Sequence, residues 1–506
     1  MSKAWRNILI IVLVVALLAG ALVFLLLNEE PSDSNKDTSN DETTEEISLI
    51  AIDRKEDETA SPIQSATISS PTFGSFTVDQ RKDGALSVTE YADLTPNTSL
   101  FESLENTLTK ITAMKQISEN VDPSVYGFDK PQATFNVTYT AGKTYAFEFG
   151  NEEPFGTGDY FRFAGSNTVY LVDTLLLDSL ALNPKAYINT VLYSTPVLPE
   201  ATATQEVEGV LRDIDFSGSF YGNQSFAFRM LGDNDTGDHK YTNYLITKPF
   251  VRSSDSDKLG DEIITATTLT ASLAVVPRYT KQDLKTYGLS DPYIVAKLHT
   301  AAYIRDTKEK DGEAVSSVSF KNVEEHTVTF SKPDKNGTHY VIVDDNPTIY
   351  EITGDSVAWF GLTYEDSISP LLFLKDITSV ETLTLTLNGN TTEFALTHYP
   401  DKEDNDEKLT VTANKQTIST GNFRSFYQVL MGISRTGSAD KTPVGTPDMR
   451  LQIETKDSSL EIRMYADGAS IYLVENQGEI YKTTASQVRN LQKQLENLLE
   501  GKDVMT

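Results

Sequence analysis

Residues 126–131 read Tyr-Gly-Phe-Asp-Lys-Pro and open the stretch that decides the fold, which closes with Val-Tyr-Leu-Val at residues 169–172. Between them, apolar and polar side chains alternate on both sides of a glycine-containing turn at residues 141–143. Alternation with a period of two is typical of a half-buried β-strand, so two such runs joined by a turn predict an antiparallel hairpin. The alternating apolar residues are Ala133, Phe135, Val137 and Tyr139 before the turn, and Tyr145, Phe147 and Phe149 after it.

The same plan occurs twice more along the chain. It returns between Tyr-Gly-Leu-Ser-Asp-Pro at residues 287–292 and Ile-Tyr-Glu-Ile at residues 349–352. A third copy runs from Val-Gly-Thr-Pro at residues 444–447, where Val replaces the opening Tyr, to Ile-Tyr-Lys at residues 480–482. Self-similarity at a nearly constant spacing indicates an architecture of repeated units.

We interpret the recurring residues of the three copies as structural. A glycine at the end of a helix can adopt a positive φ, and a proline shortly after it prevents the helix from continuing. Alternating strands on either side of this step would then form a sheet with one face in water. The motif residues are Tyr126, Gly127, Pro131, Tyr170, Tyr287, Gly288, Pro292, Tyr350, Gly445, Pro447 and Tyr481.

The chain of 506 residues is too long for one hydrophobic core, and its length allows roughly three domains of about 150 residues. The three motif glycines lie 161 and 157 residues apart, which agrees with three units. We expect an α+β fold: three repeated units of mainly antiparallel sheet plus helices, after one N-terminal transmembrane helix. The expected boundaries are 1–28 for the cytoplasmic tip and anchor, 29–46 for an acidic disordered linker, and 47–194, 195–375 and 376–500 for the units.

Apolar residues at helical spacing predict one main helix in each unit. The first runs from Leu100 to Ile117 behind a cap region at residues 97–99, and the second from Ile263 to Val276. In the third unit, Asn388-Gly389 predicts a tight hairpin turn. Further helices are expected near residues 175–182, 423–433 and 488–498, and residues 305–323 read as a polar insert between two strands of the second unit.

The N-terminal segment predicts a membrane anchor. From Ile8 to Leu27 every residue is apolar or glycine, and as a helix this run is about 30 Å long, which matches the hydrocarbon core of a bilayer. Because Lys3 and Arg6 precede the run, we expect a single-pass protein of the cell membrane with a cytoplasmic N-terminus and the bulk of the chain outside. A cleaved signal peptide is the alternative, since Ala-Gly-Ala at residues 19–21 allows cleavage within the run.

Composition excludes several classes of function. The formal net charge of −30 disfavours nucleic acid as a partner, and the absence of cysteine excludes disulfides, thiolate metal sites and a cysteine nucleophile. Phosphate-loop, nucleophile-elbow and paired zinc-histidine motifs do not occur. The acidic segments at residues 233–238 and 401–408 lack EF-hand spacing, so we interpret them as loops and leave calcium binding open. We predict no catalytic residue, no metal site and no cofactor.

The Tyr-Gly-x-x-x-Pro opening, the turn from Phe-Gly-Asn at residues 149–151 to Gly-Asp-Tyr-Phe at residues 158–161, and the Val-Tyr-Leu-Val close together resemble a bacterial family called domain of unknown function 4340. The match is strongest over the first unit and weakest over the third. The resemblance implies a membrane-anchored extracytoplasmic protein that accompanies an export-type ABC transporter similar to the gliding-motility system. Its implied partners are ABC permease and ATPase subunits, and it supplies no catalytic residues.

Three hypotheses of function remain. The first is a non-enzymatic envelope protein, an auxiliary or scaffold subunit of an ABC-type transport system. The second is a module that binds cell wall or another ligand through exposed aromatic residues such as Tyr160, Phe161 and Trp359. The third is a hydrolase of wall polymers, which would need a carboxylate pair lining one cleft.

Overall fold

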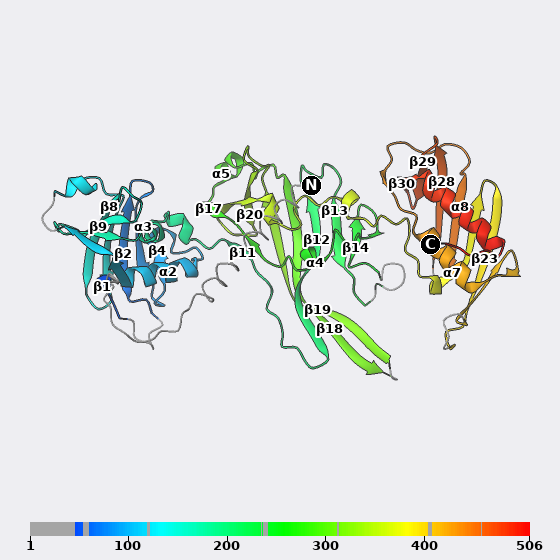
Figure 1. The fold of residues 1–506 in the computed structure, drawn as a ribbon, viewed down its shortest axis with the longest axis horizontal. Coiled ribbons are helices and arrows are strands. Elements are labelled where there is room, and N and C mark those ends of the chain that lie inside the picture. The colour runs from blue at the N-terminus through cyan, green and yellow to red at the C-terminus, as the bar shows by residue number, and fades with distance from the viewer. Residues whose placement is uncertain are drawn as a thin grey trace, which may run out of the picture.

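The computed structural model describes residues 46–53, 60–118, 122–233, 235, 241–310, 313–402, 407–456 and 458–505. Three large antiparallel sheets follow one another along this part of the chain, and Figure 1 shows them as three bodies in a row. We call the bodies built on these sheets units 1, 2 and 3. The fold is therefore α+β with repeated sheet units, as the sequence predicts.

Unit 1 carries an eight-stranded sheet and two main helices, and a two-stranded ribbon of β1 (Ile47–Ala51) with β5 (Lys110–Ala113) lies beside them. Its helices are α2 (Thr98–Thr109) and α3 (Thr174–Leu180), with short 3₁₀ turns at Thr89–Tyr91, Pro123–Tyr126 and Pro184–Tyr187. The sheet strands are β2 (Ile63–Ser70), β3 (Gly74–Gln80), β4 (Leu86–Val88), β6 (Lys115–Ser118), β7 (Ala133–Tyr139), β8 (Thr144–Glu152), β9 (Asp159–Phe163) and β10 (Val169–Val172).

Unit 2 carries a nine-stranded sheet with three short helices, α4 (Asp261–Ile264), α5 (Lys281–Thr286) and α6 (Tyr364–Ser367). A second ribbon joins β11 (Val191–Tyr193) to β16 (Leu269–Thr270). The sheet strands are β12 (Gln205–Ser217), β13 (Phe226–Met230), β14 (Tyr244–Lys248), β15 (Arg252–Ser253), β17 (Leu273–Val276), β18 (Ile294–Lys310), β19 (Glu313–Phe330), β20 (Thr338–Val343) and β21 (Ile349–Thr353).

Unit 3 carries a nine-stranded sheet covered by two helices, α7 (Thr420–Met431) and α8 (Ala485–Leu499). Both helices bury an apolar stripe, which includes Phe423, Leu430 and Leu491. The strands are β22 (Val380–Leu387), β23 (Asn390–His398), β24 (Leu409–Ala413), β25 (Gln416–Thr417), β26 (Gly437–Ser438), β27 (Met449–Thr455), β28 (Ser459–Asp467), β29 (Ile471–Asn476) and β30 (Glu479–Thr484).

The three large sheets share one strand order. In each, a first meander (β2–β4, β12–β15 or β22–β25) and a second meander (β7–β10, β18–β21 or β27–β30) meet along their first strands. A short strand that precedes the second meander in sequence (β6, β17 or β26) pairs with the last strand of that meander and forms the far edge. The chain must therefore return from this edge to the sheet centre, and the Gly-Pro step lies on that return.

The buried side chains form two clusters rather than three. One cluster belongs to unit 1 and includes Phe135, Phe147 and Phe161. The other runs through units 2 and 3 without a break, contains both Trp359 and Leu491, and takes in Leu94 and Ile188 from the border of unit 1. Continuous burial means that units 2 and 3 share a core, while unit 1 keeps its own.

Two predicted helices are wrong in extent. The helix from Leu100 ends at Thr109, and Ile111, Met114 and Ile117 lie on or beside strands β5 and β6. The helix expected from Ile263 to Val276 is one turn, α4, followed by strands β16 and β17. Short apolar runs are compatible with both the helical and the strand periodicity. Here β16 pairs with β11 and β17 pairs with β21, so these residues form strands.

The polar insert predicted at residues 305–323 belongs to the long hairpin β18–β19, which projects from the body of unit 2 (Figure 1); residues 311–312 lie outside the described residues. The turn at Asn388-Gly389 forms as predicted, with positive φ at both residues between β22 and β23. The predicted anchor at residues 8–27 lies outside the described residues. Among the residues that are described, no helix has the length and apolar character needed to span a bilayer.

Candidate functional site

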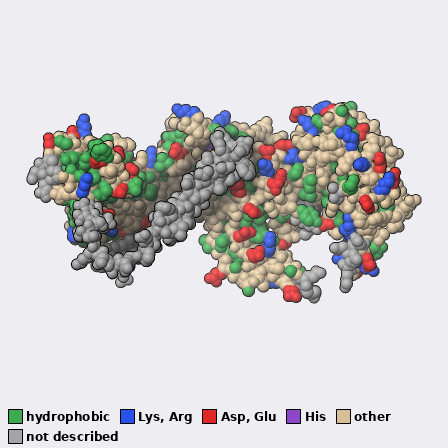
Figure 2. All heavy atoms as spheres, viewed as in Figure 1, with side chains coloured by type: hydrophobic (Ala, Val, Ile, Leu, Met, Phe, Trp, Pro, Cys, Tyr) green, Lys and Arg blue, Asp and Glu red, His purple; other side chains and the backbone are tan. Residues whose placement is uncertain are grey.

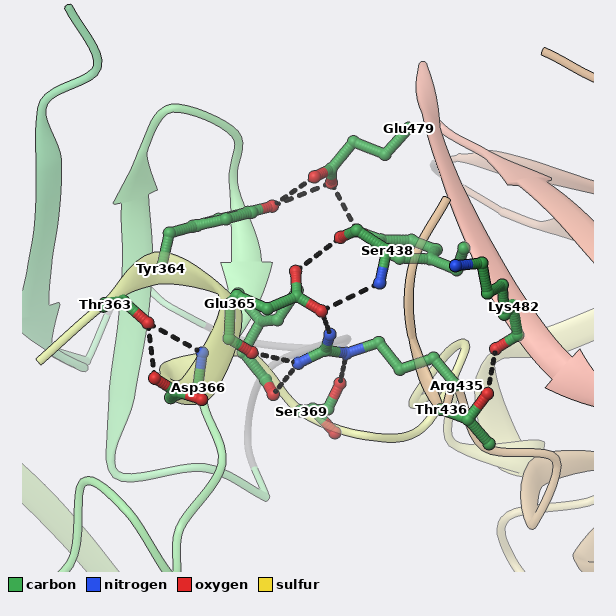
Figure 3. A network of polar contacts seen from close by, with 12 residues as sticks. Thr363, Tyr364, Glu365, Asp366, Ser369, Arg435, Thr436, Ser438, Glu479 and Lys482 are labelled. Carbon is green, nitrogen blue, oxygen red and sulfur yellow. Dashed lines mark hydrogen bonds and ion pairs between the residues drawn. The ribbon is translucent and has the colours of Figure 1, made fainter. Parts of the chain in front are cut away.

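A polar cluster lies where unit 2 meets unit 3. It is built by α6 and β15 of unit 2, by the β26 region and β30 of unit 3, and by the segment after α6 that joins the two units (Figure 3). Two isolated β-bridges fasten this segment, Ser254 with Ile368 on the unit 2 side and Leu371 with Ser434 on the unit 3 side. The cluster therefore sits on the only covalent path between the two units.

The carboxylate of Glu479 is the centre of the first half of the cluster. It is ion-paired with the guanidinium of Arg252, and the side chains of these residues are only 11% and 14% exposed. The hydroxyl of Tyr364 lies 2.8 Å from each carboxylate oxygen, and the hydroxyl of Tyr481 donates at 2.5 Å. One buried carboxylate of unit 3 thus receives two donors from unit 2, Arg252 and Tyr364, and one from its own strand.

The guanidinium of Arg435 is the centre of the second half. It donates to the Glu365 carboxylate at 2.6 Å, to the Glu365 and Ile368 carbonyl oxygens at 2.5 and 3.1 Å, and to the Ser369 carbonyl oxygen at 3.3 Å. The same carboxylate accepts from the backbone N–H of Ser438 at 3.0 Å and from its hydroxyl at 2.5 Å. Figure 3 shows Glu365 of unit 2 held between Arg435 and Ser438 of unit 3.

The surroundings fix the protonation of these groups at neutral pH. Burial raises the pKa of the Tyr481 hydroxyl to about 12, and the hydrogen bond to Glu479 adds to the rise. Burial also raises the pKa of Tyr364 strongly, with further contributions from Tyr481 and Glu479. Burial alone would lower the pKa of Arg252, but Tyr481 and Glu479 outweigh it and raise that pKa. Both tyrosines are therefore neutral donors, and Arg252 is a cation.

Two cavities flank the cluster. The first, of about 240 Å³, is lined by Arg252, Arg435, Leu460 and Asn476 among others. Asn476 is 4% exposed; its amide nitrogen donates to the Leu372 carbonyl oxygen at 2.7 Å, and its Oδ1 has no hydrogen-bond partner within the described chain. The second cavity, of about 420 Å³, has aromatic walls that include Phe220, Tyr221, Phe250 and Tyr364.

The motif glycines and prolines lie at equivalent places in the three units. Gly127, Gly288 and Gly445 all have positive φ, and each motif proline lies two residues before the first strand of its second meander. At Gly127 a Cβ would lie 2.3 Å from Oδ1 of Asn151, so the chain also needs glycine there for space. The prolines are Pro131, Pro292 and Pro447.

The motif tyrosines have different partners in different units. The rings of Tyr126 and Tyr287 each stand edge-on to a tyrosine of the third strand of their meander, with centroids 4.6 Å apart in both cases. In unit 3 the corresponding Val444 is 93% exposed. The closing tyrosines all lie on the last strand: Tyr170 is half-buried, Tyr350 accepts from Asn346 at 3.1 Å, and Tyr481 joins the cluster between the units.

Other sequence-based candidates do not form a site. Phe161 and Trp359 are 0% and 1% exposed, so the proposal that they present an exposed binding surface is wrong. In the acidic loop that begins at Asp233, the Asp235 carboxylate is paired with Arg229 at 2.6 Å. Within the described residues, no three His, Asp or Glu side chains are arranged to hold a metal ion.

Sequence reasoning found Tyr481 but missed the other members of the cluster. Tyr364 and Glu479 are 115 residues apart, and Glu365 and Arg435 are 70 apart. Neither pair belongs to a local pattern. The one available signal is weak: Glu479 interrupts the hydrophobic alternation just before a motif tyrosine.

Comparison with known proteins identifies one family. A family model described as domain of unknown function (DUF4340) matches residues 87–292 and 245–445. The first match spans most of unit 1 and runs into unit 2, and the second runs from unit 2 into unit 3. No curated protein and no solved structure matches the chain.

Proposed function

The chain belongs to the DUF4340 family, and from this premise we propose that it is a membrane-anchored, extracytoplasmic and non-enzymatic scaffold, an auxiliary subunit of an ABC-type transport system. In this proposal residues 8–27 anchor the protein in the cell membrane and the three units stand outside it. The permease and ATPase subunits of the transporter are its partners.

The observation that carries the proposal is the use of charge at the junction of units 2 and 3. Arg252 pairs with Glu479, and Arg435 pairs with Glu365, across the junction. The four side chains also line the two cavities beside it, and both carboxylates line the second cavity, but each carboxylate is held by a guanidinium of the other unit. The Arg252–Glu479 pair, with side chains 14% and 11% exposed, is of the kind that specifies one geometry more than it adds stability. Together with the shared core, it supports a rigid body that holds two sheets at a fixed angle.

Affinity purification from mildly solubilised membranes tests this proposal. The full chain should recover ABC permease and ATPase subunits together, in amounts comparable with its own. A Glu479→Ala variant, which loosens the junction, should recover several-fold less, whereas the matched surface variant Glu461→Ala should behave as wild type. Glu461 also pairs with two arginines of unit 3, but on an exposed strand face. Repeated recovery of the wild-type chain alone would refute the proposal.

A specific observation favours a second candidate, the ligand-binding envelope module. The cavity beside the cluster is lined by Asn476, whose buried Oδ1 has no hydrogen-bond partner within the described chain. A turn of this side chain toward the cavity would present Oδ1 as an acceptor to a small ligand that carries a donor. Such a module should be retained on purified cell wall or shifted in melting temperature by wall monosaccharides. Leu460→Trp, which fills the cavity, should abolish the effect, and no shift with wild type would count against this candidate.

A further inference from the structure

Three strands of unit 2 continue beyond the body of the sheet as an arm, formed by residues 205–211 of β12, 301–310 of β18 and 313–325 of β19. Within the described chain, β13 pairs with β12 only over residues 213–216, and β20 pairs with β19 only over residues 328–330. At the base of the arm the register shifts in both pairs, between Leu211 and Asp213 and between Thr300 and Ala302. Such bulges bend strands, and Figure 1 shows the arm projecting below unit 2.

Among the described residues, no strand pairs with the outer edge of β19 in this arm. The backbone N–H of Val318 donates to the Asp233 carboxylate at 2.7 Å, so it points away from β18. Because hydrogen-bonding direction alternates along an antiparallel pair, Ala314, Ser316 and Phe320 also point their N–H and C=O groups outward. Four successive donor–acceptor positions thus lie along an edge where the described chain places no other strand.

This edge lacks the usual protection. Residues 314–320 read Ala-Val-Ser-Ser-Val-Ser-Phe, with no charge, glycine or proline, and Val315 is 49% exposed. Exposed edge strands normally carry charges or proline that prevent pairing with another chain. Elsewhere the arm is charged, and Figure 2 shows carboxylates on it. Within this stretch the approaching strand meets one carboxylate of the described chain, that of Asp233 at Val318, and must displace it.

We propose that this edge pairs with the same edge of a second copy of the chain, antiparallel and with Ser317 opposite Ser317 of the partner. In this register Ala314 lies opposite Phe320, and Ser316 opposite Val318, so every outward-facing residue meets an outward-facing residue. Lys321 then lies opposite position 313, a glutamate in the sequence, which makes the ends of the pairing electrostatically complementary. The Asp233 carboxylate occupies the acceptor position that Ser316 of the second copy takes over.

The association is weak and needs a trapping assay. A pairing of seven residues buries no more than the low end of specific interfaces, about 1,200 Å². Each copy also carries a net charge of −30, whose repulsion is screened over about 8 Å at physiological salt. Two copies anchored in one membrane would meet at a high local concentration.

The absence of cysteine makes the register testable in the full chain. Ser317 points its own N–H and C=O toward β18, so in the dimer it forms a non-hydrogen-bonded pair with Cα atoms about 4.5 Å apart, within reach of a disulfide. Ser319, two residues along the same face, would lie about 14 Å from its copy and cannot be bridged.

Membranes containing Ser317→Cys or Ser319→Cys are oxidised mildly and run on a non-reducing gel. We expect Ser317→Cys to form at least tenfold more covalent dimer than Ser319→Cys. Adding Ser316→Pro to Ser317→Cys removes an outward N–H and should reduce the dimer at least tenfold. It spares the backbone ladder to β18 and loses only the Ser316 hydroxyl contact with Thr307 there. Adding Asp233→Ala should increase it, because the competing acceptor is gone. Equal cross-linking of the two cysteine variants, or cross-linking that survives Ser316→Pro, would overturn the proposal.

Discussion

Replacing Glu479 by alanine should uncouple unit 3 from unit 2. The substitution leaves the guanidinium of Arg252, which is 14% exposed, without its carboxylate partner. It also leaves the hydroxyls of Tyr364 and Tyr481 without the carboxylate that accepts their hydrogen bonds. Removing one member of a buried ion pair typically costs about 3–5 kcal/mol, because the remaining charge has been taken out of water. We expect a loss of this size in the free energy that holds the junction closed.

Hydrogen–deuterium exchange of the full chain, read by mass spectrometry, measures that free energy locally. At about 1.4 kcal/mol per tenfold change, backbone amides of β15, β30 and the connecting segment should exchange about two to four orders of magnitude faster in Glu479→Ala. Amides of unit 1, which has its own core, should keep their rates. The matched control Glu461→Ala should change protection by no more than about 1 kcal/mol, because its pairs are solvent-exposed.

A double variant decides whether the buried charge is the cause. Arg252→Met combined with Glu479→Leu removes both charges and keeps apolar volume, so it should recover most of the lost protection. Exchange in Glu479→Ala within threefold of wild type would refute the reasoning. The same conclusion would follow if the double variant were as labile as the single one.

Three further predictions concern single residues. Burial and the nearby carboxylates of Glu152, Asp178 and Asp173 raise the pKa of Asp159 to about 6, so the folded state binds more protons than the unfolded state between pH 4 and 6. The free energy of unfolding should therefore fall as pH rises through this window. Asp159→Asn should remove this pH dependence in urea unfolding and raise the free energy of unfolding by up to about 3 kcal/mol at pH 7. In urea unfolding, Gly445→Ala should cost the roughly 1–2 kcal/mol expected for a positive φ alone, because its Cβ would meet no other atom. Gly127→Ala should cost more than this, because its Cβ would also clash with Asn151. Tyr364→Phe loses the hydrogen bonds to the Glu479 carboxylate and should cost about 1.5–3 kcal/mol in the hydrogen–deuterium exchange assay. The control Tyr465→Phe, whose hydroxyl is 3.3 Å from Glu475, should stay within about 0.5 kcal/mol of wild type.

The three repeated units could be predicted from the sequence because the same local motif, a glycine followed by a proline and alternating strands, recurs in each. A glycine with positive φ and a proline two residues before a strand are needed wherever the chain returns to the sheet centre, so Gly127 and Gly288 stand at matching places. The helix expected through Leu269 and Val276 failed for the opposite reason. Its apolar residues fit a helical stripe, but distant strands β11 and β21 supply the pairing that makes them strands. No local pattern contains that information.

The junction between units 2 and 3 could not be predicted from the sequence, because its contacts are not repeated in the other units. Tyr350 and Tyr481 occupy equivalent last strands, yet Tyr350 bonds within its own unit and Tyr481 lies in the contact with another. Shared strand order therefore does not imply shared contacts: the fold repeats because each unit closes its own sheet in the same way, and the differences lie where one unit meets the next. Units 2 and 3 share one core, to which unit 1 contributes only Leu94 and Ile188 at its border, so the cooperative unit of this protein is larger than its repeat. A substitution at the junction should therefore lower the stability of the sheets of units 2 and 3 together, and a substitution in the core of unit 1 should lower the stability of its own sheet alone.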